Sequence, residues 1–201
     1  MGKEDKLKRY KEKRDFSKTS EPSAGKKKKE GAPVFVIQKH DASSLHYDFR
    51  LEMEGVLKSW AVPKGPSTDP GQKRLAVLTE DHPLEYADFE GIIPEGEYGA
   101  GTVIVWDTGT YRNLREEKKK DSMNMDESFR DGKIEVWLKG KKLNGGYVLI
   151  KTGRKENQWL LKKIKDDEAD ARRNPVSTEP ESVLSGKTIE EMEQTMRQES
   201  K

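Results

Sequence analysis

Three polar residues, His46, Asp48 and Arg50, alternate with apolar residues along one short stretch of the sequence. In a β-strand, successive side chains point to opposite faces, so these three residues would share one face. The apolar face would pack into a core, which leaves the polar face to line either solvent or a site. An imidazole, a carboxylate and a guanidinium in this order can hold a divalent cation beside an anion such as phosphate.

The two other histidines of the chain lie close to this stretch. His40 is at the start of the same predicted hairpin and can reach the same face, and His82 follows within the same apolar block. Two imidazoles and one carboxylate leave coordination positions open, a set that suits Mn²⁺ or Fe²⁺, and Zn²⁺ less distinctively. Arg50 would then hold a phosphoryl group by two parallel hydrogen bonds.

Further candidate contacts come from a loop and from the ends of strands. His82 and Tyr86 fall in a loop, where a rigid scaffold often displays reactive side chains. Lys64 and Arg74 stand at the end and the start of predicted strands. Each of these residues alone has an ordinary alternative: a loop histidine, a packed ring or a solvated charge. The glycine-rich segment 96–101 precedes a strand and not a helix, so we interpret it as a tight turn and not as a phosphate loop.

The elements that must position these residues are short strands, because runs of β-branched and aromatic residues alternate with turn signals at near-regular spacing. The segments predicted to be extended are 34–39, 45–53, 56–62, 74–79, 102–106, 109–112, 133–138, 146–151 and 158–164. We expect 109–112 to pair with 102–106, and 80–97 to form an ordered loop with one helical turn. The pattern predicts a mainly β protein, either an antiparallel sandwich or a closed barrel; only the barrel would remove exposed edges.

The composition indicates one compact domain with polar terminal extensions. The chain has 201 residues, of which 31% are hydrophobic and 38% are charged, and the apolar residues concentrate between about 34 and 164. We predict a domain at 32–165, a basic, partly disordered arm at 1–31, and an acidic, weakly helical or disordered tail at 166–201.

Short helices are expected in both extensions. In the arm, a helix could run from Glu4 to Arg14, with Phe16 as an anchor to the domain. In the tail, Thr188 and Glu191 fit a capping box before a helix that ends near Gln198. This helix has little apolar surface and would be marginal alone.

The formal net charge of +2 conceals an asymmetry. Residues 1–31 carry twelve Lys/Arg and six Asp/Glu, which gives +6, whereas residues 166–201 carry five and ten, which gives −5. A basic arm beside a site suits the gathering of a polyanion such as nucleic acid. The lysine run 26–29 alone would indicate only a solvated tail.

The sequence contains no cysteine, which excludes disulfides and thiolate metal sites. No apolar run approaches the roughly 18–20 residues that a membrane-spanning helix needs, and the N-terminal residues lack the apolar segment of a secretory signal. We therefore expect a soluble intracellular protein without a membrane partner.

Two consecutive runs of the sequence carry a resemblance to a known family. The run QKHDASSLHYDFRLEMEGVLKSWAVPKGPS, followed by KRLAVLTEDHPLEYADFEGIIPEGEYGAGTV, closely resembles the 3′-phosphoesterase domain of bacterial DNA ligase D and its free-standing archaeal and bacterial relatives. The likeness extends from about Arg14 to Ile164. It implies a small closed antiparallel β-barrel with the site at its surface. Because no ligase or polymerase domain is attached, we expect a stand-alone member.

The resemblance implies roles for individual residues. It assigns His40, His46 and Asp48 as ligands of a catalytic Mn²⁺, with Co²⁺ or Zn²⁺ as alternative ions, and it places Arg50, His82 and Tyr86 around the scissile phosphate. It also implies that Arg14, Asp15 and Glu21 take part in processing of the DNA end, and that Glu80 is a supporting catalytic residue. The supporting phosphate contacts that it implies are Gln38, Lys64 and Arg74.

The resemblance also implies an activity, a Mn²⁺-dependent hydrolase that heals DNA 3′ ends during break repair by non-homologous end joining. We expect a phosphodiesterase step that removes a 3′-terminal ribonucleoside, and then a phosphomonoesterase step that converts the remaining 3′-phosphate to a 3′-OH. His82 is the first candidate for the general acid. The expected partners are DNA or RNA-tipped DNA 3′ ends and, in the same pathway, a DNA ligase and a repair polymerase. The expected location is the prokaryotic cytoplasm, at the nucleoid.

Two alternatives from other functional classes stay open on the sequence. A catalytically inactive DNA-end-binding module would keep the fold and lose the chemistry. A non-haem iron oxygenase could use the same His-x-Asp pair with a distant histidine. In this sequence His40 lies upstream and Arg50 lies close to the pair, which suits a phosphate better than a 2-oxoacid cosubstrate.

Overall fold

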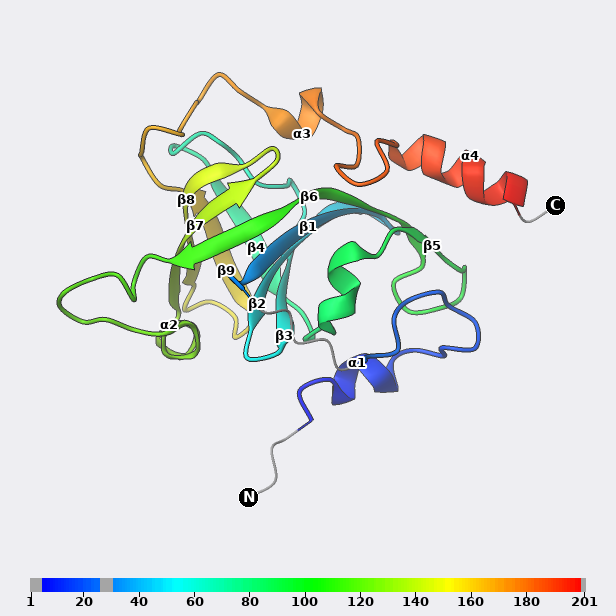
Figure 1. Cartoon of the computed structure of the whole chain (residues 1–201), viewed down its shortest axis with the longest axis horizontal. Coiled ribbons are helices and arrows are strands. Elements are labelled where there is room, and N and C mark those ends of the chain that lie inside the picture. The colour runs from blue at the N-terminus through cyan, green and yellow to red at the C-terminus, as the bar shows by residue number, and fades with distance from the viewer. Residues whose placement is uncertain (1–4, 26–30, 200–201) are drawn as a thin grey trace.

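A computed structural model describes residues 5–25 and 31–199 of the chain, and within them nine strands form one antiparallel sheet (Figure 1). The strand order is β1-β2-β3-β4-β9-β8-β7-β6-β5, and β1 also pairs with β6. Eight strands therefore close into a barrel, and β5 lies outside it, paired with β6. The predicted mainly β fold, a closed antiparallel barrel with short helices, is confirmed.

The strands are β1 (Val34–Asp41), β2 (Leu45–Met53), β3 (Val56–Val62), β4 (Lys73–Leu78), β5 (Gly91–Ile93), β6 (Gly101–Asn113), β7 (Lys133–Gly140), β8 (Asn144–Lys151) and β9 (Gln158–Lys163). The helices are α1 (Lys8–Glu12), the 3₁₀ helix η1 (Leu84–Asp88), α2 (Met125–Asp131), α3 (Pro175–Thr178) and α4 (Ile189–Glu199). None of the helices in the described residues is both long and apolar enough to cross a bilayer.

One predicted pairing is wrong. The segment 109–112 does not turn back onto 102–106, because β6 continues through both segments without a break. Its register with β1 shifts between Ile37 and Gln38, as at a β-bulge. Such a bulge bends a strand and increases its twist, so β6 can follow the curvature of the barrel where the sequence suggested a hairpin.

The barrel interior holds the main hydrophobic core, to which β2 contributes Tyr47, Phe49 and Leu51. The alternation predicted for β2 is thereby confirmed, since His46 and Asp48 belong to the opposite, outer face. A second cluster lies over the outer face of the sheet and joins side chains of β1, β3, β5 and β6 to α1 and η1. This outer face, covered by α1 and η1, carries the candidate site.

The terminal segments pack against the barrel in the part of the chain that is described. Tyr10 of α1 is fully buried in the second cluster, and Ile189 and Met192 of α4 are buried against Ile104 of β6. The capping box predicted before α4 is confirmed by its two hydrogen bonds. The division of the chain at residues 31 and 165 stays a prediction. The lysine run 26–29 and the predicted helix start at Glu4 lie outside the described residues.

Asp107 of β6 stabilises the turn between β7 and β8. Its fully buried carboxylate accepts hydrogen bonds from the backbone N–H groups of Lys141, Lys142 and Leu143 at 2.9, 3.0 and 2.8 Å. We expect Asp107→Ala to lower the free energy of unfolding by about 3 kcal/mol, because these donors would lose their acceptor in a buried position. Denaturant unfolding measures this loss, with the exposed Asp167→Ala as the control. A loss of stability in Asp107→Ala no larger than that in Asp167→Ala would contradict this role of Asp107.

Candidate metal and phosphate site

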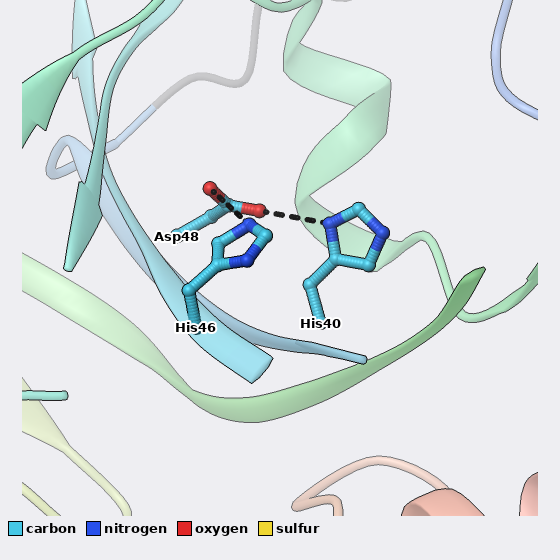
Figure 2. Close-up of side chains that lie close together, drawn as sticks. All are labelled: His40, His46 and Asp48. Carbon is cyan, nitrogen blue, oxygen red and sulfur yellow. Dashed lines mark ion pairs between the residues drawn. The ribbon is translucent and has the colours of Figure 1, made fainter. Parts of the chain in front are cut away.

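His40, His46 and Asp48 meet on the outer face of β1 and β2 (Figure 2). In the antiparallel register His40 lies opposite His46, and Gln38 lies opposite Asp48, so strand pairing alone brings the three side chains together. His40 Nδ1 lies 3.5 Å from Asp48 Oδ2, and His46 Nε2 lies 3.5 Å from Asp48 Oδ1. One ligand atom of each residue lies within 4.8 Å of the others, so the group could hold a metal ion.

Backbone carbonyls orient both imidazoles. His40 Nε2 donates to the Gly99 carbonyl at 2.8 Å, and His46 Nδ1 donates to the Ser44 carbonyl at 2.9 Å. Because a carbonyl can only accept, the neutral imidazole carries its proton on that nitrogen. The other nitrogen, which faces Asp48, then has a free lone pair, and it donates to the carboxylate only when the imidazole is protonated. Two free imidazole nitrogens and one carboxylate directed at one point form a donor set that fits a divalent transition metal.

The charge of this group depends on its surroundings. Burial would raise the pKa of Asp48, but the Arg50 guanidinium and the hydrogen bonds from His40 and His46 hold it well below its usual value. Burial would lower the pKa of His46, but its hydrogen bond with Asp48 and the charge of that carboxylate raise it. Near neutral pH, a proton therefore competes with a metal ion for His46 and not for Asp48.

Arg50 is buried beside His40, His46 and Asp48, the candidate metal-binding group, and contacts Gln38, Ser59 and Asp48. Its Nε donates to Gln38 Oε1 at 2.7 Å, and its Nη1 donates to Ser59 Oγ at 2.9 Å and lies 3.1 Å from His82 Nδ1. Its Nη2 lies 3.3 Å from Asp48 Oδ2 and makes no hydrogen bond among the described residues. Gln38 and Ser59 therefore engage Nε and one hydrogen of Nη1, and Nη2 is the nitrogen of Arg50 most open to a phosphoryl group. The two parallel hydrogen bonds expected from the sequence stay a prediction.

Gln38 lies behind Arg50 and does not line the cavity in which the metal-binding group lies. Its side-chain amide donates to the carbonyls of Tyr86 and Phe89 at 2.8 and 3.0 Å, and its oxygen accepts from Arg50. The side chain is fully buried. Gln38 therefore positions Arg50 and joins β1 to η1, and its place gives no support to the predicted contact with phosphate.

His82 is buried between two arginines. Its Nδ1 donates to the Glu80 carbonyl at 2.9 Å, and its Nε2 lies 3.3 Å from Arg14 Nη2. Burial, together with the charges of Arg50 and Arg14, lowers the pKa of His82 well below its usual value. The imidazole is therefore neutral near pH 7, and its Nε2 is an acceptor. A role as general acid stays a prediction, because it requires an anion that raises this pKa.

Residues after α1 close the site on one side. The buried Glu21 accepts from Arg14 Nε at 2.9 Å and from the Tyr86 hydroxyl at 2.8 Å. Arg14 Nη1 also lies 3.3 Å from Glu80 Oε1. Four residues that the family resemblance singled out thus share one network of hydrogen bonds and ion pairs, although they come from two separate parts of the chain.

Three other predicted residues lie apart from this network. The Asp15 side chain is exposed and accepts from the backbone and the hydroxyl of Ser17. Lys64 is exposed in the turn after β3, and Arg74 lies in β4 opposite Leu161 of β9. None of the three lines the cavity around the metal-binding group. Their predicted roles stay predictions without support from their positions.

This cavity has a volume of about 250 Å³ and opens to solvent. Its walls include His40, His46 and Asp48 together with Arg50, His82, Tyr86, Arg14 and Glu80. Sequence reasoning missed two residues near it. Ser59 lies opposite Arg50 in the pairing of β2 with β3, so the predicted hairpin register could have found it. Tyr98 lies in the glycine-rich segment, which was interpreted only as a turn.

Comparison with known proteins identifies relatives over most of the chain. Residues 38–151 match the family described as the DNA ligase D 3′-phosphoesterase domain. The multifunctional non-homologous end joining protein LigD of Pseudomonas aeruginosa is 50% identical over 189 residues, which cover 91% of this chain and 22% of that protein. The LigD proteins of Mycobacterium tuberculosis and Mycolicibacterium smegmatis are 47% and 48% identical over 163 residues, which cover 81% of this chain and 20% and 21% of theirs. The chain thus spans about a fifth of the length of these relatives.

Proposed function

The chain belongs to the DNA ligase D 3′-phosphoesterase domain family, and from this premise we propose that it is a Mn²⁺-dependent enzyme that heals the 3′ ends of broken DNA. A phosphodiesterase step removes a 3′-terminal ribonucleoside, and a phosphomonoesterase step converts the remaining 3′-phosphate to a 3′-OH. The relatives named LigD are described as non-homologous end joining proteins. We extend that pathway to this chain, with a DNA ligase and a repair polymerase as partners at the nucleoid in the cytoplasm.

One observation supports this proposal most strongly: a group of side chains that could hold a cation lines the same cavity as an arginine. Asp48 lies 3.5 Å from each imidazole and 3.3 Å from Arg50 Nη2, so an ion and an anionic ligand could be bound side by side. A phosphate monoester or diester needs this arrangement, because negative charge on its oxygens must be neutralised during transfer.

Two groups of residues have separate roles in the proposed reaction. His40, His46 and Asp48 hold the ion, which when bound polarises phosphoryl oxygens as a Lewis acid. Arg50 stabilises the charge that develops on the phosphoryl group, and its fixed position avoids reorganisation during the reaction. We favour Mn²⁺ because two nitrogens and one oxygen with open positions suit it, and activity with Co²⁺ or Zn²⁺ is an outcome that a metal-replacement assay decides.

His82 and Tyr86 complete the mechanism. An anion bound between Arg50 and Arg14 would offset the two positive charges that lower the pKa of His82, so that Nε2 could take up a proton and deliver it to the leaving oxygen. Burial and the neighbouring Glu21 raise the pKa of Tyr86 well above its usual value, so its hydroxyl stays protonated and donates to Glu21. In this position Tyr86 orders the wall of the site.

The activity is tested with a primer-template that ends in one 3′-ribonucleotide. With Mn²⁺ we expect a 3′-phosphate product first and a 3′-OH product later, and EDTA should stop both steps. His46→Ala should lose both steps as well. End binding without conversion would identify an inactive binding module, and conversion that requires oxygen would identify an oxygenase; either outcome would contradict the proposal.

The affinity for Mn²⁺ should fall as the pH falls. His46 must be neutral to bind an ion through Nε2, and its pKa is raised above the ordinary value of about 6.5. As the pH is lowered, protonation of His46 therefore begins to compete with the ion before the pH reaches that ordinary value. Asp48 does not titrate in this range. Electron paramagnetic resonance of free Mn²⁺, titrated between about pH 5.5 and 8.5, measures the effect. His46→Gln should weaken binding and flatten the pH dependence, whereas a wild-type affinity that is constant over this range would contradict the assignment.

A further inference from the structure

A tyrosine stands exposed at the mouth of the catalytic cavity. Tyr98 is 46% exposed, although it lines the same cavity as the metal-binding group. It lies in a tight turn in which Ala100 N donates to the Glu97 carbonyl at 3.1 Å. Gly99, the third residue of this turn, has a φ of +75°, which favours glycine. The turn therefore displays a large aromatic ring at its second position.

The same turn contacts a metal-binding residue. The Gly99 carbonyl accepts the hydrogen bond from His40 Nε2 at 2.8 Å. Tyr98 is thus one residue away from the group that orients His40. The hydrogen bond that orients His40 therefore also joins the turn that carries the Tyr98 ring to the candidate metal site.

Two cations hold the ring before any ligand arrives. Lys13 Nζ donates to the Tyr98 hydroxyl at 3.1 Å and lies 4.4 Å from the ring centroid. Arg14 Cζ lies 5.4 Å from the same centroid. A ring that is already ordered loses little entropy when a flat ligand stacks on it, and its exposed surface is free to receive one.

A groove of about 580 Å³ continues from the cavity, and Tyr98, Thr79 and Glu80 belong to the walls of both. Arg9 of α1 and Lys13 line this groove. Within the described part of the chain, Arg9 is exposed and makes no ion pair. It is therefore a cation available to a phosphodiester.

The charges along this groove favour a nucleic-acid strand more than those on the other side of the cavity. The groove has two carboxylates, of which Glu80 is already paired with Lys13 and Arg14, and Glu156 is the other. The groove on the other side, bordered by α4, is lined by three acids, Asp41, Glu95 and Glu193, and by one cation, Arg197. A polyanionic strand would be repelled from the second groove, and in the first it would meet Arg9, which has no ion pair within the described residues.

We propose that Tyr98 stacks on the base of the nucleoside whose 3′ oxygen carries the reacting phosphate, and that the retained strand leaves along the groove at Arg9. This inference rests on the proposed function. A ring beside cations is the combination by which proteins bind single strands without reading their sequence. In both proposed steps the retained nucleoside is joined to phosphorus through its 3′ oxygen, so one subsite serves the diester and the monoester.

The test compares two 3′-phosphate primers, one with a base on its terminal nucleotide and one abasic at that position. Tyr98→Ala should lower kcat/KM on the first primer by about tenfold or more, mainly through KM, and should change little on the abasic primer. Tyr98→Phe keeps the ring and should keep the wild-type ratio between the two primers. Leu184→Ala, which alters an exposed apolar residue outside both grooves, is the matched control.

Several outcomes would overturn the subsite. The first is a loss of kcat/KM in Tyr98→Ala that is equal on the two primers or absent on both. The second is a loss of discrimination between the primers in Tyr98→Phe that is as large as in Tyr98→Ala. Either result would show that Tyr98 only positions Lys13. An unchanged Mn²⁺ affinity of Tyr98→Ala verifies that the contact between His40 and Gly99 persists. If the wild-type protein releases no phosphate, the proposed function fails separately, and fluorescence anisotropy with the same primers still measures the discrimination by Tyr98.

Arg9 gives a second, independent readout of the same groove. Arg9→Gln should weaken binding of both primers equally, because a phosphate contact does not depend on the base. It should also make the dependence of binding on salt shallower, by about one phosphate contact. A loss confined to the primer that carries the base would contradict this arrangement.

Discussion

Replacing Arg50 with alanine should lower kcat for release of the 3′-phosphate by about 10³-fold. Arg50 Nη2 is the nitrogen most open to a phosphoryl group, since Nε donates to Gln38, and Nη1 donates to Ser59 and lies beside His82 Nδ1. Because these contacts serve only to aim the guanidinium, we expect Arg50→Lys to recover little of the activity: an ammonium cannot keep the same three neighbours. Single-turnover kinetics with saturating Mn²⁺ measure the chemical step.

The control for this prediction is Arg154→Ala, which removes an exposed arginine from the loop between β8 and β9. It should leave kcat unchanged. Since Arg50 is buried, the thermal unfolding of each variant must be compared at the assay temperature. A folded Arg50→Ala protein with activity within a few-fold of wild type would show that Arg50 does not stabilise the transition state.

The second large effect is expected for Asp48→Asn, which keeps the shape of the side chain and removes its charge. We expect the affinity for Mn²⁺ to fall by about 100-fold or more, with activity partly restored by excess ion. The pKa of His46 should also fall, because the hydrogen bond with Asp48 and the charge of that carboxylate contribute most to raising it. Isothermal titration calorimetry with Mn²⁺ measures the affinity, and nuclear magnetic resonance measures the His46 titration.

The exposed Asp121→Asn is the control for the loss of one negative charge. If Asp48→Asn binds Mn²⁺ as wild type does, Asp48 is no ligand and the metal site must lie elsewhere. If binding is lost but activity persists without excess ion, the ion is not needed for catalysis.

The barrel and the metal-binding group were predictable because local patterns determine them. Alternation along β2 places His46, Asp48 and Arg50 on one face, and a short hairpin fixes the register that puts His40 opposite His46. What the alternation could not show is how much of Arg50 is already engaged. Its partners Gln38, Ser59 and His82 come from three different elements, and their contacts depend on how those elements cross.

The terminal segments make contacts with residues that are distant in the sequence, and local patterns could not predict these contacts. Arg14 pairs with Glu80, which is 66 positions away in the sequence, and no property of the arm indicates that partner. In α4, Ile189 and Met192 lie one turn apart and form a short apolar stripe that was visible in the sequence. The helix is expected to be marginal alone, and the sequence does not show that Ile104 of β6 covers this stripe.

The central claim is that His40, His46 and Asp48 bind one divalent ion beside Arg50, and anomalous diffraction from crystals soaked with Mn²⁺ and phosphate tests it most directly. We predict one anomalous peak bounded by His40 Nδ1, His46 Nε2 and the Asp48 carboxylate, with the phosphate in contact with Arg50 Nη2. A peak at any other place in an active protein, or none between these three side chains, would contradict it.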